Sequence, residues 1–133
     1  LNKSKNIFIS KTHISKQVWK QNPSFKPDGL WVSHKFQTNK PSWLDWCYDN
    51  NFLNWIDPCL NTYFSMDISK CKMLKLNTKN KIIKFNEKYK VIKQGVALID
   101  WSKLSNKYDG VEFSPYFLEF KQDPEYMWYS AID

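Results

Sequence analysis

Aromatic side chains are the most distinctive chemical feature of this sequence. Its 133 residues include 7 Trp, 7 Tyr and 9 Phe. Trp31 lies in a short apolar segment, and Trp43, Trp46 and Tyr48 follow it at spacings that suit a helix. Two facing aromatic planes bind a flat heterocycle by offset stacking, which contributes about 0.5–1.5 kcal/mol per ring pair beyond burial. We therefore consider Trp31 and one helix aromatic as a clamp for such a ring. The alternative is that these rings fill the core.

Side chains that could transfer a proton or stabilise a charge are few. The only histidines are His13 and His34, which are too few for most histidine-based metal sites. The 3 Cys form no C-x-x-C pair and support neither a disulfide framework nor a zinc site. Of the 4 Glu, Glu112 and Glu119 lie in segments whose alternation is typical of strands. We therefore predict no metal and treat these carboxylates as the candidate catalytic groups.

Two short aromatic segments follow one another in the sequence, Gly29-Leu30-Trp31-Val32-Ser33 and the downstream Trp46-Cys47-Tyr48. They resemble the nicotinamide-binding region of ADP-ribosyltransferases. The similarity is to the branch with a His, aromatic and Glu signature, which includes poly(ADP-ribose) polymerases, diphtheria-toxin-like enzymes and small bacterial rifampicin-modifying enzymes. In that branch a His ends the first strand, an aromatic strand leads into a helix with a second aromatic residue, and a Glu lies on a later strand. His13 and Glu112 occupy the corresponding positions in this sequence.

The match is short, and the sequence departs from the family pattern at two places. Ile14 follows His13 where a Gly is common, and Trp31 replaces the more usual Tyr. His34 is therefore an alternative to His13, and Glu119 is an alternative to Glu112. The sequence contains no Arg, which excludes the Arg-led branch and argues against the related RNA 2′-phosphotransferases.

The resemblance implies an α+β fold with split mixed or antiparallel sheets flanked by short helices, and NAD as a substrate. Glu112 would stabilise the positive charge that develops on the ribose as the nicotinamide bond breaks. Trp31 and Trp46, or Tyr48, would hold the nicotinamide ring. His13 would form a hydrogen bond to the adenosine-side ribose, and Ser33 or Ser42 would form one to the carboxamide of nicotinamide. Lys26 or Lys35 would contact the pyrophosphate as a point charge. We expect Trp31 and Glu112 to line one crevice.

Apolar periodicity predicts the elements that must position these residues. We expect strands over residues 6–10, 30–33, 62–68, 71–76 and 111–114. Helices are expected over residues 14–22, 43–52, 82–92 and 101–104, and the aromatic tail 124–132 should pack against the core. The third of these helices carries an apolar stripe of Ile82, Phe85, Tyr89 and Ile92. Because strands and helices mix without a regular βαβ order, the expected class is α+β.

The charge of the chain is positive and unevenly distributed. All 20 basic residues are Lys, and the net charge is +7. Residues 1–40 carry a charge of +7 and residues 70–93 carry +8, whereas residues 41–69 and 94–133 each carry −4. The segment Lys70–Lys93 could contact an acidic partner electrostatically. The alternative function is therefore nucleic-acid binding by a non-enzymatic domain with stacking Trp residues. The simplest interpretation of the Lys70–Lys93 segment is a solvent-exposed helix.

Length and composition favour one globular domain over residues 1–133. Hydrophobic residues make up 42%, which is enough to form a core and excludes a disordered or collagen-like chain. No apolar run approaches the ~20 residues that span a bilayer, and unpaired Cys suit a reducing compartment. We therefore expect a soluble cytoplasmic protein. The sequence begins without Met and stops at Asp133, which leaves a C-terminal truncation open, and the acceptor of ADP-ribose is not encoded in any motif.

Overall fold

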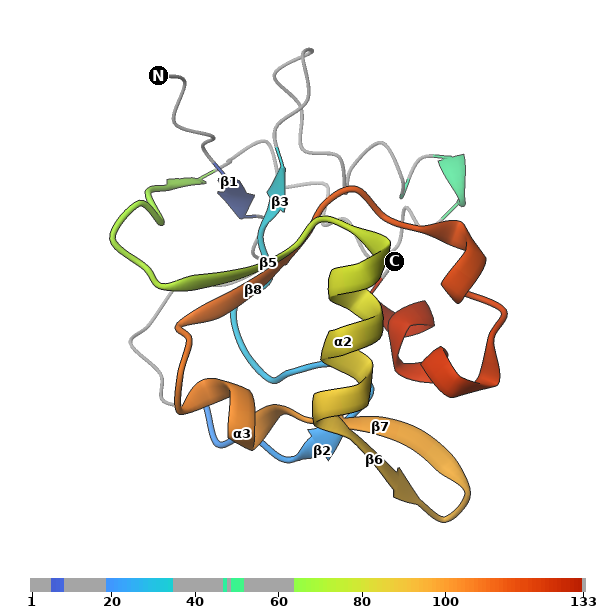
Figure 1. The fold of residues 1–133 in the computed structure, drawn as a ribbon. Helices are drawn as coiled ribbons and strands as arrows, with labels where there is room; N and C mark the ends of the chain where they lie inside the picture. Colours follow the sequence, from blue (N-terminus) through green and yellow to red (C-terminus); the bar gives the residue numbers. More distant parts are fainter. Residues whose placement is uncertain (1–5, 9–18, 35–46, 48, 52–63, 133) are drawn as a thin grey trace. The chain divides into compact units, whose positions relative to one another are not determined.

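Short strands and helices alternate along the chain without a regular βαβ order, which confirms the predicted α+β class (Figure 1). The computed structural model describes residues 6–8, 19–34, 47, 49–51 and 64–132. Its contacts divide the chain into two compact units. Unit 1 comprises residues 1–17 and 30–70, and unit 2 comprises residues 18–29 and 71–133. The expectation of a single domain over residues 1–133 stays a prediction.

Unit 1 contains a three-stranded antiparallel sheet in the order β3-β1-β4. Its strands are β1 (Asn6–Phe8), β3 (Ser33–His34) and β4 (Phe64–Met66). Strands β1 and β4 fall within the predicted strands. The predicted strand over residues 30–33 begins later than expected, because the pairing of β3 with β1 involves only Ser33 and His34. Of the helix predicted over 43–52, the structure describes residues 47 and 49–51, and Cys47 and Asp49 are helical.

A second antiparallel sheet, in unit 2, has the order β2-β7-β6. It consists of β2 (Pro23–Ser24), β6 (Lys90–Lys93) and β7 (Val96–Asp100). The two-residue loop between β6 and β7 has positive φ at both Gln94 (49°) and Gly95 (75°), as in the type I′ turns that suit the twist of a hairpin. Residues 19–22, predicted as helical, instead lead into β2. This prediction was wrong because Ser24 and Pro23 pair with β7.

The strands β5 (Met73–Leu76) and β8 (Gly110–Phe113) form a parallel pair, here called the β5–β8 ribbon. Both strands were predicted. Asp109 fixes the start of the ribbon, since its carboxylate accepts from the Lys72 N–H at 2.7 Å and its own N–H donates to the Lys72 carbonyl at 2.9 Å. The pairing stops at Phe113, and Pro115, which has no backbone N–H to donate, lies two residues further on.

Helix α2 (Lys79–Tyr89) begins at Thr78, whose hydroxyl accepts from the Lys81 N–H at 3.2 Å. The predicted apolar stripe is buried at Ile82, Phe85 and Tyr89. Ile92 is an exception, because the backbone becomes extended at Lys90 and Ile92 lies in β6, 58% exposed. The helix therefore ends three residues earlier than predicted.

Three shorter helical segments complete unit 2. They are α3 (Trp101–Ser105) and the 3₁₀ segments η2 (Leu118–Phe120) and η3 (Pro124–Ala131). Helix α2 contacts β5 and α3 (Figure 1). An ion pair between Lys79 and Glu119 joins it to η2. The tail packs as predicted, since Trp128 and Tyr129 of η3 are fully buried. Within the described residues, no helix has the length and apolar character needed to span a bilayer.

Aromatic rings form the centre of the unit 2 core. The indole of Trp128 lies 5.3 Å from the ring of Phe85 and 6.2 Å from those of Trp101 and Phe113, measured between centroids. These residues come from η3, α2, α3 and β8, so one side chain connects four elements. The buried Trp128 N–H donates to the side-chain oxygen of Asn86 at 2.8 Å, which satisfies both polar groups.

We expect Asn86→Ala to lower the free energy of unfolding by about 1–3 kcal/mol, because it leaves the buried indole N–H of Trp128 without its acceptor. Urea unfolding followed by circular dichroism measures this. Asn80→Ala is the matched control, since Asn80 lies exposed on the same helix and the substitution brings a similar gain in helix propensity. Equal changes in the two variants would contradict the stabilising role of the hydrogen bond.

Candidate functional site

The sheet of unit 1 brings the exit of β1 and the approach to β3 to the same end. In the antiparallel register, Ile7 lies opposite Ser33 and Asn6 lies opposite His34. Chain direction therefore places Phe8, the last residue of β1, at the end of the sheet where Trp31 and Val32 lead into β3. His13 follows β1 by five residues in the sequence. The strand that precedes His13 and the segment that carries Trp31 are thus neighbours.

Trp31 differs from the tryptophans of the core. It is 40% exposed, whereas Trp101 and Trp128 are 1% and 0% exposed. The core-filling role considered for the aromatic residues applies to these two buried indoles. An exposed indole can still stack on a ligand, so Trp31 keeps the property that its proposed role requires.

Several predicted site residues lie outside the described part of the chain. They are His13, Trp46 and Tyr48, together with the alternatives Ser42 and Lys35. Ser33 and the alternative His34 form β3, where only their backbone is described. The predicted aromatic partner of Trp31 and the predicted ribose ligand therefore stay predictions.

Glu112 lies in the middle of β8, as predicted, on the face of the ribbon that points away from the unit 2 core. Side chains alternate along a strand, and its neighbours Val111 and Phe113 both pack against the core. Its register partner Lys75 therefore shares the outer face with it. The Glu112 side chain is half-buried. A carboxylate held on a strand in this way has a fixed backbone position, which a group that stabilises developing charge needs.

The alternative carboxylate, Glu119, lies in a different setting. The structure places it in η2, so the strand predicted over residues 118–120 is wrong. The 3₁₀ turn is stabilised by the burial of Phe120 in the core. Glu119 is exposed and forms an ion pair with Lys79, which holds the pKa of its carboxyl below the usual value. This arrangement is typical of a surface ion pair.

Lys75 and Met73 lie opposite Glu112 and Gly110 in the ribbon, and no local pattern in the sequence predicts these neighbours. Both lie on β5, and Lys75 precedes Glu112 by 37 residues in the sequence. A Cβ added at Gly110 would lie 2.8 Å from the Met73 sulfur, so the thioether covers Gly110 on the outer face. The alternation of residues 73–76 was a usable signal for the strand, but pairing with β8 is not encoded locally.

The predicted site residues belong to different units. Trp31 and Ser33 lie in unit 1, whereas Glu112 and the alternative Glu119 lie in unit 2. The structure describes each unit by itself. The expectation that Trp31 and Glu112 line one crevice therefore stays a prediction.

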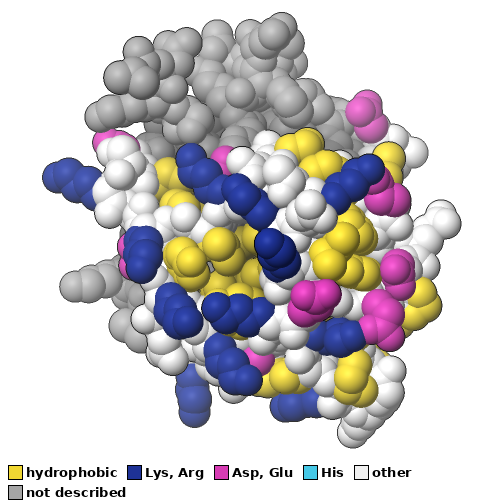
Figure 2. Space-filling view, in the orientation of Figure 1, with side chains coloured by type: hydrophobic (Ala, Val, Ile, Leu, Met, Phe, Trp, Pro, Cys, Tyr) yellow, Lys and Arg dark blue, Asp and Glu magenta, His cyan; other side chains and the backbone are white. Residues whose placement is uncertain are grey.

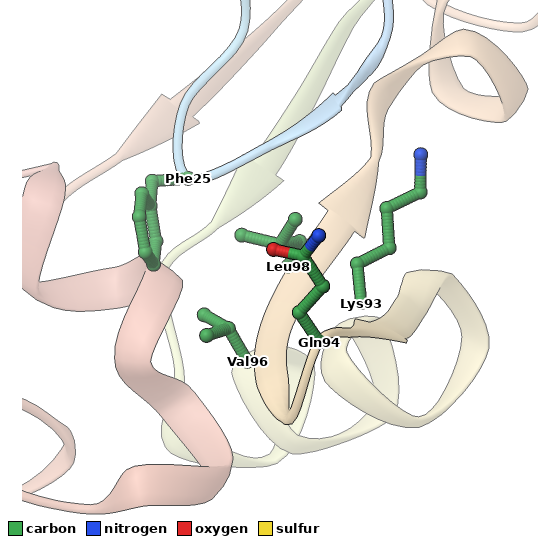
Figure 3. Close-up of a pocket in the computed structure, with 5 residues that line it drawn as sticks. All are labelled: Phe25, Lys93, Gln94, Val96 and Leu98. Carbon is green, nitrogen blue, oxygen red and sulfur yellow. The ribbon is translucent and has the colours of Figure 1, made fainter.

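A shallow depression of about 530 Å³ lies beside the β6–β7 hairpin in unit 2 (Figure 3). Its lining is mainly apolar and consists of Phe25, Lys93, Gln94, Val96 and Leu98. It contains no carboxylate, histidine, cysteine or hydroxyl group and none of the predicted site residues. Its side chains provide one cation and one amide, which gives no basis for a catalytic role.

The cysteines show no arrangement for metal binding or nucleophilic chemistry in the described residues. Cys47 is buried, and this burial raises the pKa of its thiol, which disfavours the reactive thiolate. Cys71 is exposed. No group of three His, Cys, Asp or Glu side chains that could hold a metal ion occurs among the residues that the structure describes.

The position of the Met73 thioether leads to a test of the ribbon that carries Glu112. We expect Gly110→Ala to destabilise unit 2 by about 1 kcal/mol, because the new methyl group must displace this flexible side chain. In a Met73→Ala background the same change should cost less, since the clashing atoms are absent. Urea unfolding of the two single variants and the double variant gives the coupling energy. An identical cost of Gly110→Ala in both backgrounds would show that the two side chains are not in contact.

Comparison with known proteins gives no relative: no family model, curated protein or solved structure matches this chain. Any assignment of function therefore rests on the residues of the chain itself.

Proposed function

We propose that this chain is an NAD-dependent mono-ADP-ribosyltransferase. It would cleave the bond between nicotinamide and ribose and transfer ADP-ribose to an acceptor. The observation that carries the proposal is the position of Glu112, a half-buried carboxylate in the middle of β8 and on the face away from the core. The resemblance of the segments around Trp31 and Trp46 to a nicotinamide-binding region supports it.

The proposed chemistry requires a fixed negative charge. The bond between the ribose C1′ and the nicotinamide nitrogen breaks, and its electron pair leaves with neutral nicotinamide. Positive charge then develops on C1′ and the ring oxygen of the ribose. The Glu112 carboxylate would accept hydrogen bonds from ribose hydroxyls and stabilise this charge more strongly than it stabilises the ground state. An acceptor nucleophile attacks C1′ and loses its proton.

Unit 1 would hold the leaving group. The exposed indole of Trp31 would form one plane against the nicotinamide ring, and Trp46 or Tyr48 would form the second. His13 would bind the adenosine-side ribose, and it follows the strand that pairs with β3. The register of β1 and β3 supports this assignment, because it places β1, the strand that precedes His13, beside the segment that carries Trp31.

We expect Glu112→Gln to reduce nicotinamide release from NAD by about 100-fold or more, the magnitude typical of a preorganised group that stabilises transition-state charge. The measurement uses NAD labelled in the nicotinamide ring. Glu119→Gln is the matched control, because it removes the same charge from the exposed ion pair with Lys79, and its rate should stay within about twofold of the wild type. Unchanged activity in Glu112→Gln would exclude Glu112, and loss only in Glu119→Gln would transfer the role to that residue.

We expect Trp31→Ala to weaken NAD binding roughly tenfold, since it removes one stacking plane and its buried area. Isothermal titration calorimetry with NAD measures this affinity. Trp19→Ala is the control, because Trp19 has nearly the same exposed fraction, 41% against 40% for Trp31. Equal affinities of the two variants would contradict the role of Trp31, and an absence of NAD binding by the wild type would contradict the proposed function.

A further inference from the structure

Positive and negative side chains lie on different parts of unit 2. Figure 2 shows lysine side chains gathered around apolar surface over the β5–β8 ribbon, α3 and α2, with acidic side chains gathered over the η2–η3 segment. The acidic side chains of that segment include Glu119, Asp123 and Glu125. On the face drawn in Figure 2, the acidic side chains of the η2–η3 segment are thus separate from the lysines over the ribbon and α3, although Glu87 lies on α2 and Asp109 at the start of the ribbon.

Three lysines form a row along α2. Lys81, Lys84 and Lys88 are spaced three and four residues apart, so they lie on one flank of the helix and span about 10 Å along its axis. All three are exposed. Phe85, adjacent to this flank, contacts both Trp101 of α3 and Trp128 of η3. At about 3.6 residues per turn, Lys79 lies on the opposite flank, where it forms an ion pair with Glu119 of η2. The row therefore lies on the flank away from the acidic segment.

A fourth lysine lies at the start of the ribbon, next to apolar surface. The ammonium of Lys72 is 5.2 Å from the centroid of the half-buried Tyr108 ring. Leu74 and Val111 are also half-buried. We call Lys72, Lys81, Lys84 and Lys88 with this apolar surface the basic face.

The lysines of the basic face differ from those beside the acidic segment. Lys79 and Lys90 form ion pairs with Glu119 and Glu125. Within the part of the chain that the structure describes, none of the four lysines of the basic face forms an ion pair. The Lys81 ammonium donates to the side-chain oxygen of Asn77 at 2.7 Å, and this neutral partner leaves its charge unpaired. Exposed ammonium groups without an ion pair can attract an external polyanion.

We propose that the basic face binds the phosphate backbone of single-stranded nucleic acid. Lysine interacts with phosphate as a point charge, whereas it is depleted in protein–protein interfaces, where arginine is favoured, and this chain has no Arg. A single strand also exposes its bases, which can pack on the apolar surface around Tyr108, whereas a duplex hides them. The proposal does not depend on the proposed transferase activity, since binding is measured without NAD.

The test measures binding of the full chain to a fluorescein-labelled oligothymidylate and oligouridylate of about 20 nucleotides, between about 50 and 200 mM NaCl. We expect the triple variant Lys81→Gln, Lys84→Gln, Lys88→Gln to bind more weakly by a factor of about 100 or more at about 50 mM NaCl. The slope of log K against log salt should fall in magnitude by about 2, at about 0.7 per lost contact. Lys79→Gln, Lys90→Gln, Lys121→Gln is the matched control with the same change in net charge, and its slope should stay close to that of the wild type.

Circular dichroism of both triple variants verifies that the fold is retained. Equal losses in the two variants would overturn the proposal, because net charge alone would then explain the binding. It would also be overturned by affinity that does not depend on salt. Tighter binding to a duplex of the same length, or to polyglutamate, would instead assign the basic face to double-stranded nucleic acid or to an acidic protein.

Discussion

Burial of the Trp128 indole is the interaction on which unit 2 depends. This one side chain packs against Phe85 of α2, Trp101 of α3 and Phe113 of β8, and it donates its N–H to Asn86. Aromatic contacts at these distances combine a large buried area with directional preference, and the hydrogen bond removes the cost of burying a polar group. The indole therefore fixes the helix and the ribbon in one arrangement.

This arrangement determines which side chains remain outside the core. Because Phe113 points inward, strand alternation places Glu112 on the outer face of β8. Because Phe85 and Asn86 point inward, Lys84 and Lys88 lie on the outer side of α2. The two features that carry the functional proposals, a carboxylate on a strand and a row of lysines on a helix, are thus consequences of the same packing.

Much of unit 2 could be predicted from the sequence, because its signals are local. The apolar stripe of α2 and the alternation of β5 each lie within a few residues. The β6–β7 hairpin was missed, since Gln94-Gly95 is a weaker turn signal than Asn-Gly and Ile92 continues the helical spacing past the end of α2. Glu119 was assigned to a strand because the packing of Phe120, which favours a 3₁₀ turn, is a tertiary effect. Candidate site residues could be chosen by type and position, but the neighbours of Glu112 on β5 arise from pairing between distant segments.

The most direct test of the central claim is a crystal structure of the full chain grown with NAD. Our account predicts that the nicotinamide ring stacks on the Trp31 indole and that a hydroxyl of the adjoining ribose lies within hydrogen-bond distance of the Glu112 carboxylate. Electron density for NAD that contacts neither side chain would contradict it.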